Sequence, residues 1–566
     1  MPTDSVSLPH THSFNPSRWR IGFAAATALC LAAIPARAVP VAIDSGAIEG
    51  VTEGAAKVYK GIPFASPPVG ELRWRAPQPP APWSGVKVAN RFSPVCMQRG
   101  AYPEDAPPEP MSEDCLYLNV WVPVGVSSGV NAGVNADASA GKKLPVMVWI
   151  HGGGLRNGSA STPLYSGAQL ARHGVMVVTA NYRLGALGFL AHSELTRESP
   201  NRVSGNYGLL DQLAALQWVQ RNIAAFGGDA ANVTVFGQSS GAISISALAT
   251  SPLATGLFHR AIAQSGGLFE PIEFAAEFAL KGAEESGAGF AARLAAPSLP
   301  TLRFLPAADI AAARFSPNAV IDGYLLREPP YNAYAAGRVN PIDILIGFNA
   351  GEGYDFINGR TVTVATLPTL LRQDFPPVIV TLNGPKTPAT DQEALAAFVA
   401  FEGNMRFGWN MLAWADLHAR HTSGNTFLYH FEHTPPGERG ARHGVEMAYV
   451  FGHPNPGWTD ADHRVANLMA SYWANFAKTG NPNGEGLPAW PTFTPASEQA
   501  LLIGDETRAG ALPNRSDLAA IDRTYGAARF LMGNLFAVGG VALALLVALL
   551  VLAWHAVRRF VRLRAP

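Results

Sequence analysis

Apolar and polar positions follow two repeating patterns along this chain. Apolar positions at helical spacing, 209, 213, 216, 219, 223 and 226, predict one amphipathic helix over 209–226. Short, unbroken apolar runs typical of buried strands occur at 145–150, 175–182, 233–236, 342–348 and 426–431. Alternation of strands with helices favours an α/β fold built on a mostly parallel sheet that helices cover on both faces. Active sites in such sheets gather at the carboxyl ends of the strands.

The N-terminal segment has the layout of a secretory signal. Basic residues at 18 and 20 precede an apolar run at 21–34, and Ala36-Arg-Ala38 follows. This order of a basic region, a short apolar region and a small-residue cleavage site predicts a signal peptide over residues 1–38, cleaved after Ala38. The run is too short to span a bilayer.

A second apolar segment lies near the C-terminus. Residues 533–557 are apolar except for Asn534 and His555. As a helix they would extend roughly 37 Å, enough to cross a ~30 Å hydrocarbon core. Arginines follow at 558, 559, 562 and 564, which predicts a cytoplasmic basic tail over 558–566 and a folded domain, residues 39–525, on the periplasmic or extracellular side. The alternatives are a C-terminal core helix or a lipid-anchor attachment signal.

Charge and cysteine content narrow the possible partners. Lys plus Arg and Asp plus Glu both number 42, so bulk charge does not indicate nucleic-acid binding. The histidines show no metal-ligand spacing, and neither a metal nor a cofactor is expected. Cys30 falls inside the predicted signal, which leaves Cys96 and Cys115. This pair either forms a disulfide, which an oxidising compartment favours, or stays as two buried thiols.

A nucleophile elbow is the clearest catalytic signal. The β-branched run 233–236 ends at Gly237, and Ser239 stands between Gly237 and Gly241 before a helix-compatible segment. Such a strand-turn-helix layout holds a serine hydroxyl clear of its backbone. The same pattern around Ser127 lies in the Gly- and Ala-rich stretch 124–143, which has no flanking strand or helix and is predicted to be a flexible insertion. Context therefore selects Ser239.

Glycines after the first predicted strand provide the matching anion site. His151 is followed by three glycines, 152–154. Glycines let a loop turn several N–H groups toward one point, as stabilisation of a tetrahedral oxyanion requires. Combined with the elbow, this loop predicts oxyanion donors at the N–H groups of Gly153, Gly154 and Ser240.

A serine nucleophile needs a histidine base and an acid that orients it. Proteins with a nucleophile elbow place the acid and then the histidine after the serine in chain order. The loop after strand 342–348 contains Glu352, with Asp355 as second choice. The loop after strand 426–431 leads to His433 and His443, and position alone does not separate them.

Several longer segments share the pattern of one known family. They are 61–74 (GIPFASPPVGELRW), 112–119 (SEDCLYLN), 151–154 (HGGG), 181–183 (NYR), 205–211 (GNYGLLD), 237–241 (GQSSG), 347–353 (GFNAGEG), 443–446 (HGVE) and 449–452 (YVFG). In this order they resemble the type-B carboxylesterases, a family that includes the cholinesterases. The resemblance covers nearly all of the mature chain to about residue 505.

This resemblance implies an α/β-hydrolase fold and carboxylic-ester hydrolysis. It implies that Ser239 is the nucleophile, Glu352 the acid and His443 the base. It also implies a Cys96–Cys115 disulfide. Within Gln264-Ser-Gly266, it assigns Ser265 as a buried hydroxyl beside the acid.

Two differences from the family pattern limit what the resemblance implies for this chain. The family elbow often has Glu before the serine and Ala after it, whereas this chain has Gln238 and Ser240. Loss of that carboxylate weakens the case for a choline-type cationic substrate. Family members usually lack the insertion at 124–143.

Two functions remain to be compared. One is an exported, membrane-anchored serine esterase that forms an acyl-enzyme from a small-molecule ester, without metal or cofactor and without a nucleic-acid partner. The other is a catalytically weak adhesion or binding protein on the same fold, since the cholinesterase-like family includes anchored members that lost catalytic residues. All three triad positions and the oxyanion glycines are present here, which favours the esterase.

Overall fold

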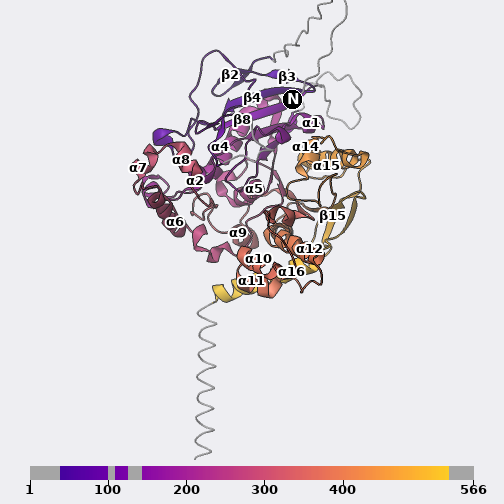
Figure 1. Cartoon of the computed structure of the whole chain (residues 1–566). Coiled ribbons are helices and arrows are strands. Elements are labelled where there is room, and N and C mark those ends of the chain that lie inside the picture. The colour runs from indigo at the N-terminus through magenta and orange to yellow at the C-terminus, as the bar shows by residue number, and fades with distance from the viewer. Residues whose placement is uncertain (1–38, 100–108, 125–142, 535–566) are drawn as a thin grey trace, which may run out of the picture. The chain divides into compact units, whose positions relative to one another are not determined.

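The computed structural model describes residues 39–99, 109–124 and 143–534. Its centre is an 11-stranded sheet (Figure 1). From one edge to the other, the strands are β16 (Arg508–Ala511), β15 (Gln499–Ile503), β14 (Thr426–Phe431), β13 (Asp343–Asn349), β12 (Arg260–Gln264), β11 (Gly228–Gln238), β9 (Leu144–Ile150), β10 (Met176–Ala180), β8 (Tyr117–Pro123), β4 (Ala56–Pro63) and β3 (Val51–Glu53). Two smaller sheets pair β1 (Val41–Ile43), β2 (Gly46–Glu49) and β5 (Val86–Val88), and β6 (Val95–Cys96) with β7 (Met111–Ser112).

The strands of the large sheet run parallel in its centre and antiparallel at its edges. Every neighbouring pair from β10 across to β15 is parallel. β16 at one edge, and β8, β4 and β3 at the other, pair antiparallel. The expected mostly parallel sheet is thus correct for the centre, and the sheet as a whole is mixed. The central strands all end at one edge, where active sites of such sheets lie.

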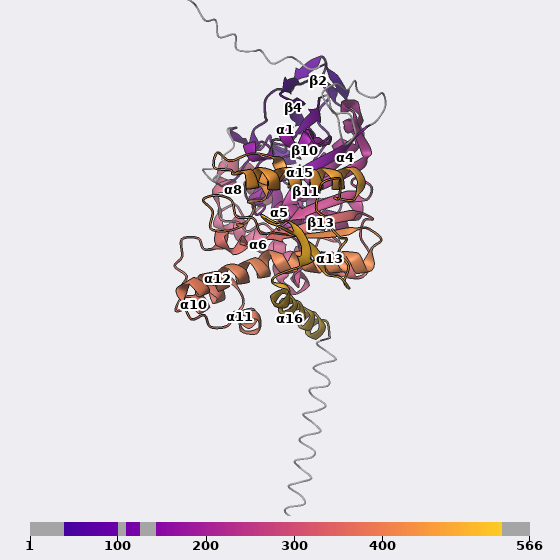
Figure 2. The same ribbon diagram turned by 90° about the vertical axis from the view of Figure 1, so that its right-hand side faces the viewer.

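Helices cover both faces of this sheet. They are α1 (Ala168–Ala171), α2 (Gly185–Phe189), α3 (Ser193–Glu198), α4 (Tyr207–Asn222), α5 (Ser240–Thr250), α6 (Leu280–Arg293), α7 (Leu299–Phe304), α8 (Ala307–Ala312), α9 (Pro330–Ala335), α10 (Leu367–Asp374), α11 (Pro377–Asn383), α12 (Asp391–Gly403), α13 (Trp409–His421), α14 (Met447–Phe451), α15 (Asp460–Thr479) and α16 (Arg515–Gly533). In Figure 2, α15 lies across the central strands on the side that faces the viewer.

Side-chain alternation along the strands divides the core in two. In β9, Val146 and Val148 belong to one buried cluster, together with residues of α4, α5 and α13. Met147 and Trp149, the intervening positions, belong to a second cluster with residues of α14 and α15. Successive side chains of a strand point to opposite faces, so a strand that is covered on both sides is apolar throughout. This explains why the strands appear in the sequence as unbroken apolar runs.

The predicted helix over 209–226 is α4, which begins at Tyr207 and continues as a 3-10 turn over Ile223–Phe226. All six apolar positions of the predicted stripe are buried. The helix is amphipathic as predicted, with a solvent-facing side at Gln217 and Arg221, but its buried face also includes polar residues. Asp211 is fully buried and forms an ion pair with Arg183 at 2.7 Å. A buried ion pair thus widens the buried face beyond the apolar stripe, because each charge has its partner.

Three predicted segments lie mainly outside the described residues. These are the signal peptide over 1–38, the insertion over 124–143 apart from Val124 and Lys143, and the membrane segment over 533–557 apart from Gly533 and Asn534. The tail over 558–566 lies outside them too. Within residues 39–99, 109–124 and 143–534, no helix has both the length and the apolar character needed to cross a membrane.

The predicted end of the folded domain at residue 525 needs correction. Residue 525 falls inside α16, which continues to Gly533. Arg529, in the last turns of this helix, donates to Glu273 Oε1 at 2.9 Å and to the Phe269 carbonyl at 2.6 Å. α16 is therefore part of the folded domain as far as Arg529, because this side chain packs on the segment that follows β12.

The remaining cysteines form one disulfide. Cys96, in β6, is bonded to Cys115, just before β8. Gln98 follows the first cysteine, and its amide joins the Cys96 carbonyl to the backbone of Gly158. Through Gln98, this cross-linked loop supports the glycine loop after β9.

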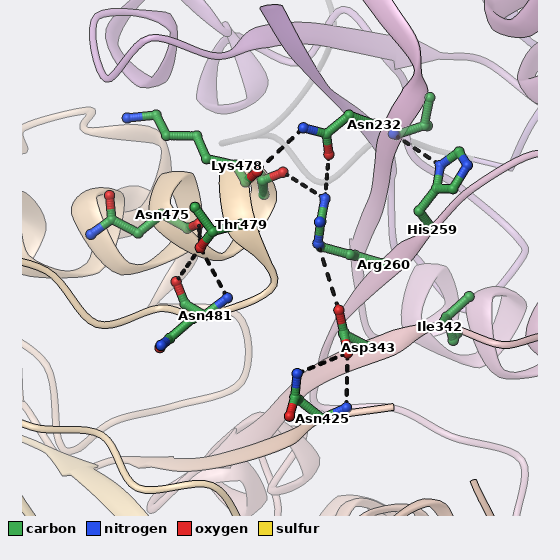
Figure 3. Close-up of polar contacts among 12 residues, drawn as sticks. Asn232, His259, Arg260, Ile342, Asp343, Asn425, Asn475, Lys478, Thr479 and Asn481 are labelled. Carbon is green, nitrogen blue, oxygen red and sulfur yellow. Dashed lines mark hydrogen bonds and ion pairs between the residues drawn. The ribbon is translucent and has the colours of Figure 1, made fainter. Parts of the chain in front are cut away.

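A polar network holds α15 against the amino ends of three central strands (Figure 3). Arg260 begins β12, and its guanidinium donates to Asn232 Oδ1 and to the carbonyl of Ala477 near the end of α15. Asp343, at the start of β13, lies 3.7 Å from Arg260 Nε and accepts from the Asn425 N–H at 2.8 Å. These contacts lie at the end of the sheet opposite the elbow.

We expect the Arg260→Leu substitution to lower the free energy of unfolding by about 1–3 kcal/mol, because it leaves Asp343 without its cation and two carbonyl-type acceptors without their donor. Thermal denaturation measures the change. The Arg338→Leu substitution is the matched control, since the Arg338–Glu328 pair is exposed and should contribute little to stability. Equal melting temperatures for the two variants would contradict this interpretation.

Candidate active site

The backbone conformation at Ser239 is strained in the way a nucleophile elbow requires. Ser239 lies between β11 and α5 with φ 55° and ψ −124°, a region that non-glycine residues rarely occupy. Its N–H donates to the Gln264 carbonyl of β12 at 2.8 Å. A Cβ at Gly237 would come within 2.7 Å of the Ile150 carbonyl oxygen, and a Cβ at Gly241 would meet the same oxygen. Both glycines are therefore required by β9, which lies directly beside the turn.

Glu352 is completely buried and holds the His443 ring. Its carboxylate Oε2 lies 2.6 Å from His443 Nδ1, while Oε1 accepts from the Ser265 hydroxyl at 2.5 Å and the Asn349 N–H at 2.8 Å. Glu352 begins the 3-10 turn Glu352–Phe356 after β13, and Ser265 directly follows β12. Neighbouring parallel strands thus bring the predicted acid and its supporting hydroxyl to one edge of the sheet.

The competing candidates lie in other surroundings. His433 bridges Asp462 at 2.8 Å and Asp505 at 2.7 Å, and it makes no contact with Glu352. Asp355 lies 3.8 Å from Arg442 and accepts from the backbone N–H of His443 rather than from its ring. Among the two predicted acids and two predicted bases, the described side-chain contacts join Glu352 to His443.

The His443 ring has the tautomer that a general base needs. Because Nδ1 faces the Glu352 carboxylate, the proton lies on Nδ1 and leaves Nε2 as acceptor. The Gln238 amide nitrogen lies 3.1 Å from that Nε2, and the ring of Phe407 stacks on the imidazole with centroids 4.4 Å apart. Within the described residues, no hydrogen bond joins the Ser239 hydroxyl to His443. Such contacts are often longer before substrate binds.

Neighbouring carboxylates set the proton affinity of His443. Burial lowers the pKa of the imidazole, but the charge and hydrogen bond of Glu352, with the charges of Glu446 and Asp355, raise that pKa above its usual value. The raised pKa means that these carboxylates stabilise the imidazolium that forms when His443 accepts a proton.

Sequence reasoning did not assign a role to Glu446. This carboxylate is fully buried and accepts from the Asn349 amide at 2.5 Å and the Gln264 amide at 2.9 Å. Burial and the charge of Glu352 raise its pKa. The one signal in the sequence was its position three residues after His443. Gln264 and Asn349 end β12 and β13, so Glu446 links these strands to the loop that carries the histidine.

The glycine loop after β9 presents unpaired N–H groups. Gly153 and Gly154 have φ values of 106° and 63°, and a Cβ at Gly153 would meet the Asn157 carbonyl oxygen. Within the described chain, the N–H groups of Gly153, Gly154 and Ser240 have no protein acceptor. A Cβ at Gly154 would meet no protein atom within 4 Å, so open space adjoins this residue. The Ser240 hydroxyl accepts from the Leu155 N–H at 3.1 Å and ties the loop to α5.

The loop is supported from below by His151 and Tyr182. The Tyr182 hydroxyl donates to the His151 carbonyl at 2.7 Å, and the two rings stack with centroids 4.3 Å apart. Burial lowers the pKa of His151 to about 4, so its ring stays neutral. A Cβ at Gly158 would contact the His151 ring, which explains the glycine there. These contacts hold the donor groups in place before any substrate arrives.

A cavity of about 410 Å³ adjoins this loop. It is lined mainly by apolar groups that include Leu155, Ile243, Leu268, Ile272 and Phe278, and it reaches Gly154 and Ser240. Such a cavity can hold a small apolar group next to the oxyanion donors. Among the described residues, no group of three His, Cys, Asp or Glu side chains is placed to hold a metal ion.

Comparison with known proteins places this geometry in a family. The chain matches the model of the carboxylesterase family over residues 37–521. Fumonisin B1 esterase from Sphingopyxis macrogoltabida is 38% identical over 486 residues, covering 82% of this chain and 86% of that protein. Carboxylesterase 4A from Bos taurus is 35% identical over 522 residues, covering 83% of this chain and 91% of that protein.

Solved structures agree with the sequence relatives. A structure of PNB esterase aligns with a TM-score of 0.72 and 33% identity, over 85% of this chain and 99% of that one. Another structure of PNB esterase gives the same TM-score at 32% identity. The large mixed sheet is accordingly that of the α/β-hydrolase fold. The chain belongs to the carboxylesterase family and is a carboxylic-ester hydrolase.

Proposed function

We propose that this protein hydrolyses small-molecule carboxylic esters through an acyl-enzyme on Ser239. His443 Nε2 takes the Ser239 proton while Oγ attacks the ester carbonyl carbon. The carbonyl oxygen becomes an oxyanion that accepts from the N–H groups of Gly153, Gly154 and Ser240. His443 then returns the proton to the alcohol oxygen, the carbon–oxygen bond breaks and the alcohol leaves.

Water completes the cycle by the same steps. His443 removes a proton from water, the hydroxide oxygen attacks the acyl carbon, and the new oxyanion collapses as Ser239 Oγ receives the proton back. Glu352 stays ionised throughout and stabilises the imidazolium. The observation that carries this proposal is the 2.6 Å contact of His443 with fully buried Glu352, beside an elbow whose neighbouring N–H groups have no protein acceptor.

A fluorophosphonate label tests the nucleophile directly. We expect it to attach to Ser239, as tryptic peptide mass spectrometry would show, in step with the loss of turnover of p-nitrophenyl butanoate. Attachment at another residue, or full activity after labelling, would contradict the proposal. A binding protein without catalysis, the alternative function, would neither turn over the ester nor react with the label at a catalytic rate.

We further propose that the enzyme is exported and anchored. Residues 1–38 would direct export and be cleaved, residues 533–557 would span the membrane, and the basic tail would remain in the cytoplasm. The catalytic domain would then lie on the periplasmic or extracellular side. The Cys96–Cys115 disulfide supports this location, since disulfides persist in oxidising compartments.

Truncation after Asn534 should release the enzyme from membranes with kcat/KM within about twofold of the full chain, because every described contact of α16 is kept. Truncation after Gly526 is the comparison. It removes Arg529 and leaves Glu273 buried without its partner, so we expect a loss of about 1–3 kcal/mol of stability. Carbonate extraction and thermal denaturation measure the two effects. If the Asn534 truncation remained in carbonate-washed membranes, the anchor assignment would be wrong.

A further inference from the structure

The cavity beside the oxyanion loop contains one ionisable group. Of its described lining residues, Glu270 alone can carry a charge, and the others are apolar, glycine, serine or amide. Glu270 follows Phe269 in the segment after β12, a few residues beyond Ser265. A single carboxylate in an apolar cavity beside reacting groups can strongly influence which substrates bind there, because few water molecules compete with a ligand.

The orientation of the Glu270 carboxylate is set by α13. Asn410 Nδ2 donates to Glu270 Oε1 at 2.6 Å. The other end of the same amide, Asn410 Oδ1, accepts from the Phe269 N–H at 2.9 Å. The backbone contact determines which end of the amide faces the carboxylate, so Asn410 presents its NH₂ group and Glu270 accepts.

The cation near Glu270 is Arg529, and its described contacts are with other groups. Arg529 pairs with Glu273 Oε1 at 2.9 Å, donates to the Phe269 carbonyl and lies 3.5 Å over the Tyr331 ring. Among the described residues, no ion pair within 4 Å involves Glu270. Two carboxylates therefore share the neighbourhood of one guanidinium. The excess negative charge lies on the group that lines the cavity.

The side of the ester that enters this cavity follows from the path of the proton. In the proposed mechanism His443 gives a proton to the departing alcohol oxygen, so the alcohol group lies on the His443 side of Ser239. The cavity reaches the oxyanion donors at Gly154 and Ser240, and its lining contains neither His443 nor the Phe407 ring stacked on it. The cavity therefore receives the acyl group.

We propose that Glu270 selects esters whose acyl group carries a primary ammonium, by pairing with that cation inside the cavity. This inference rests on the proposed esterase function and adds a substrate class to it. An ammonium has three donors and no acceptor, which matches a carboxylate that already accepts from one amide. Charge-assisted hydrogen bonds are roughly twice as strong as neutral ones, so the carboxylate should favour an ammonium over a methyl group of similar size.

Matched ester pairs test this proposal on the intact enzyme. The 6-aminohexanoyl and heptanoyl esters of p-nitrophenol differ only in a terminal ammonium or methyl group, and the 3-aminopropanoyl and butanoyl esters form a shorter pair. After each kcat/KM is divided by the rate of hydroxide hydrolysis, we expect at least one ammonium ester to exceed its neutral partner by roughly tenfold or more. The 6-carboxyhexanoyl ester should be the poorest of the long substrates.

The Glu270→Gln substitution keeps the Asn410 contact and removes the charge. It should reduce the ammonium-to-methyl ratio about tenfold or more, and the ratio cancels any loss common to both esters. Glu277→Gln is the control, because Glu277 is an exposed carboxylate in the same segment and does not line the cavity. Its ratio should match the wild type.

The ratio should also rise with pH. Burial raises the pKa of Glu270, whereas Asn410, nearby backbone N–H groups and Arg529 lower it. Tyr525 of α16 also faces this group. Deprotonation of Glu270 creates the charge that the ammonium needs, while the titration of His443 affects both esters equally and cancels. The Glu270→Gln ratio should be independent of pH.

Each remaining result would overturn the proposal. Turnover of neutral esters without an ammonium preference refutes the inference and leaves the esterase function intact. The same holds if the preference survives in Glu270→Gln, or if it appears only when the ammonium is on the alcohol, as in 3-aminopropyl against butyl acetate. Absence of turnover for every ester would refute both the function and the inference.

Discussion

Ester turnover should fall by on the order of 10⁴-fold or more when Ser239 is replaced by alanine. The strained turn, the glycines on either side and the N–H groups nearby all converge on this hydroxyl. Without it no acyl-enzyme can form, and only the residual effect of substrate binding and the oxyanion donors remains. The kcat for p-nitrophenyl butanoate, measured on a variant whose melting temperature matches the wild type, checks the expectation.

The Ser127→Ala variant is the control for this first prediction. Ser127 satisfies the same five-residue pattern but stands in the predicted insertion. Its kcat and labelling by fluorophosphonate should equal those of the wild type. If Ser239→Ala kept substantial turnover while Ser127→Ala lost it, Ser127 rather than Ser239 would be the nucleophile.

The second large effect concerns the base and its acid. His443→Ala should lose roughly 10³-fold or more in kcat, since triad members act as a unit. Glu352→Gln should also be severely impaired, because it removes the charge that stabilises the imidazolium. In that variant the pKa of His443 should drop, so the acid limb of kcat/KM should move to lower pH. A pH profile of kcat/KM for residual activity measures this shift.

The competing histidine and acid supply matched controls. His433 bridges two aspartates away from the elbow, so His433→Ala should lower the melting temperature while each folded molecule keeps most of its kcat. Asp355→Asn should likewise remain active. Active-site titration with the fluorophosphonate separates loss of folded enzyme from loss of rate. If His433→Ala or Asp355→Asn were the more damaging member of its pair, that assignment would be reversed.

Local sequence signals were sufficient for the strands and for the turn that carries Ser239. The apolar runs predicted β9, β10, β11, β13 and β14 to within a few residues, because burial on both faces requires unbroken apolar residues. The extra length of β11, the parallel strands β12 and β15 and the antiparallel edge strands were missed. Edge strands are partly exposed and lack that continuous pattern.

Helix faces were less predictable, and α4 shows why. Its apolar stripe was read correctly, but Asp211, Gln212 and Asn222 within or beside that stripe are buried too. Each has a polar partner from another element or from its own helix: Arg183 for Asp211, Ser244 for Gln212 and the Trp218 carbonyl for Asn222. A polar residue with a buried partner cannot be distinguished by sequence pattern from one that faces water.

The sequence by itself determined the α/β architecture, the elbow at Ser239, the glycine loop and the preference for Glu352, because these depend on neighbours within a few positions. The resemblance to the carboxylesterases added His443. Only the tertiary structure showed which groups meet: His443 lies 91 positions from Glu352, and Arg529 lies 256 positions from Glu273. Three further features depend on strand register and helix docking. They are the position of Glu446 beneath the acid, the contacts of Arg529 with its partners, and the lack, among the described residues, of an ion pair for Glu270. No local pattern encodes such contacts, since they arise where parallel strands and packed helices bring distant segments together.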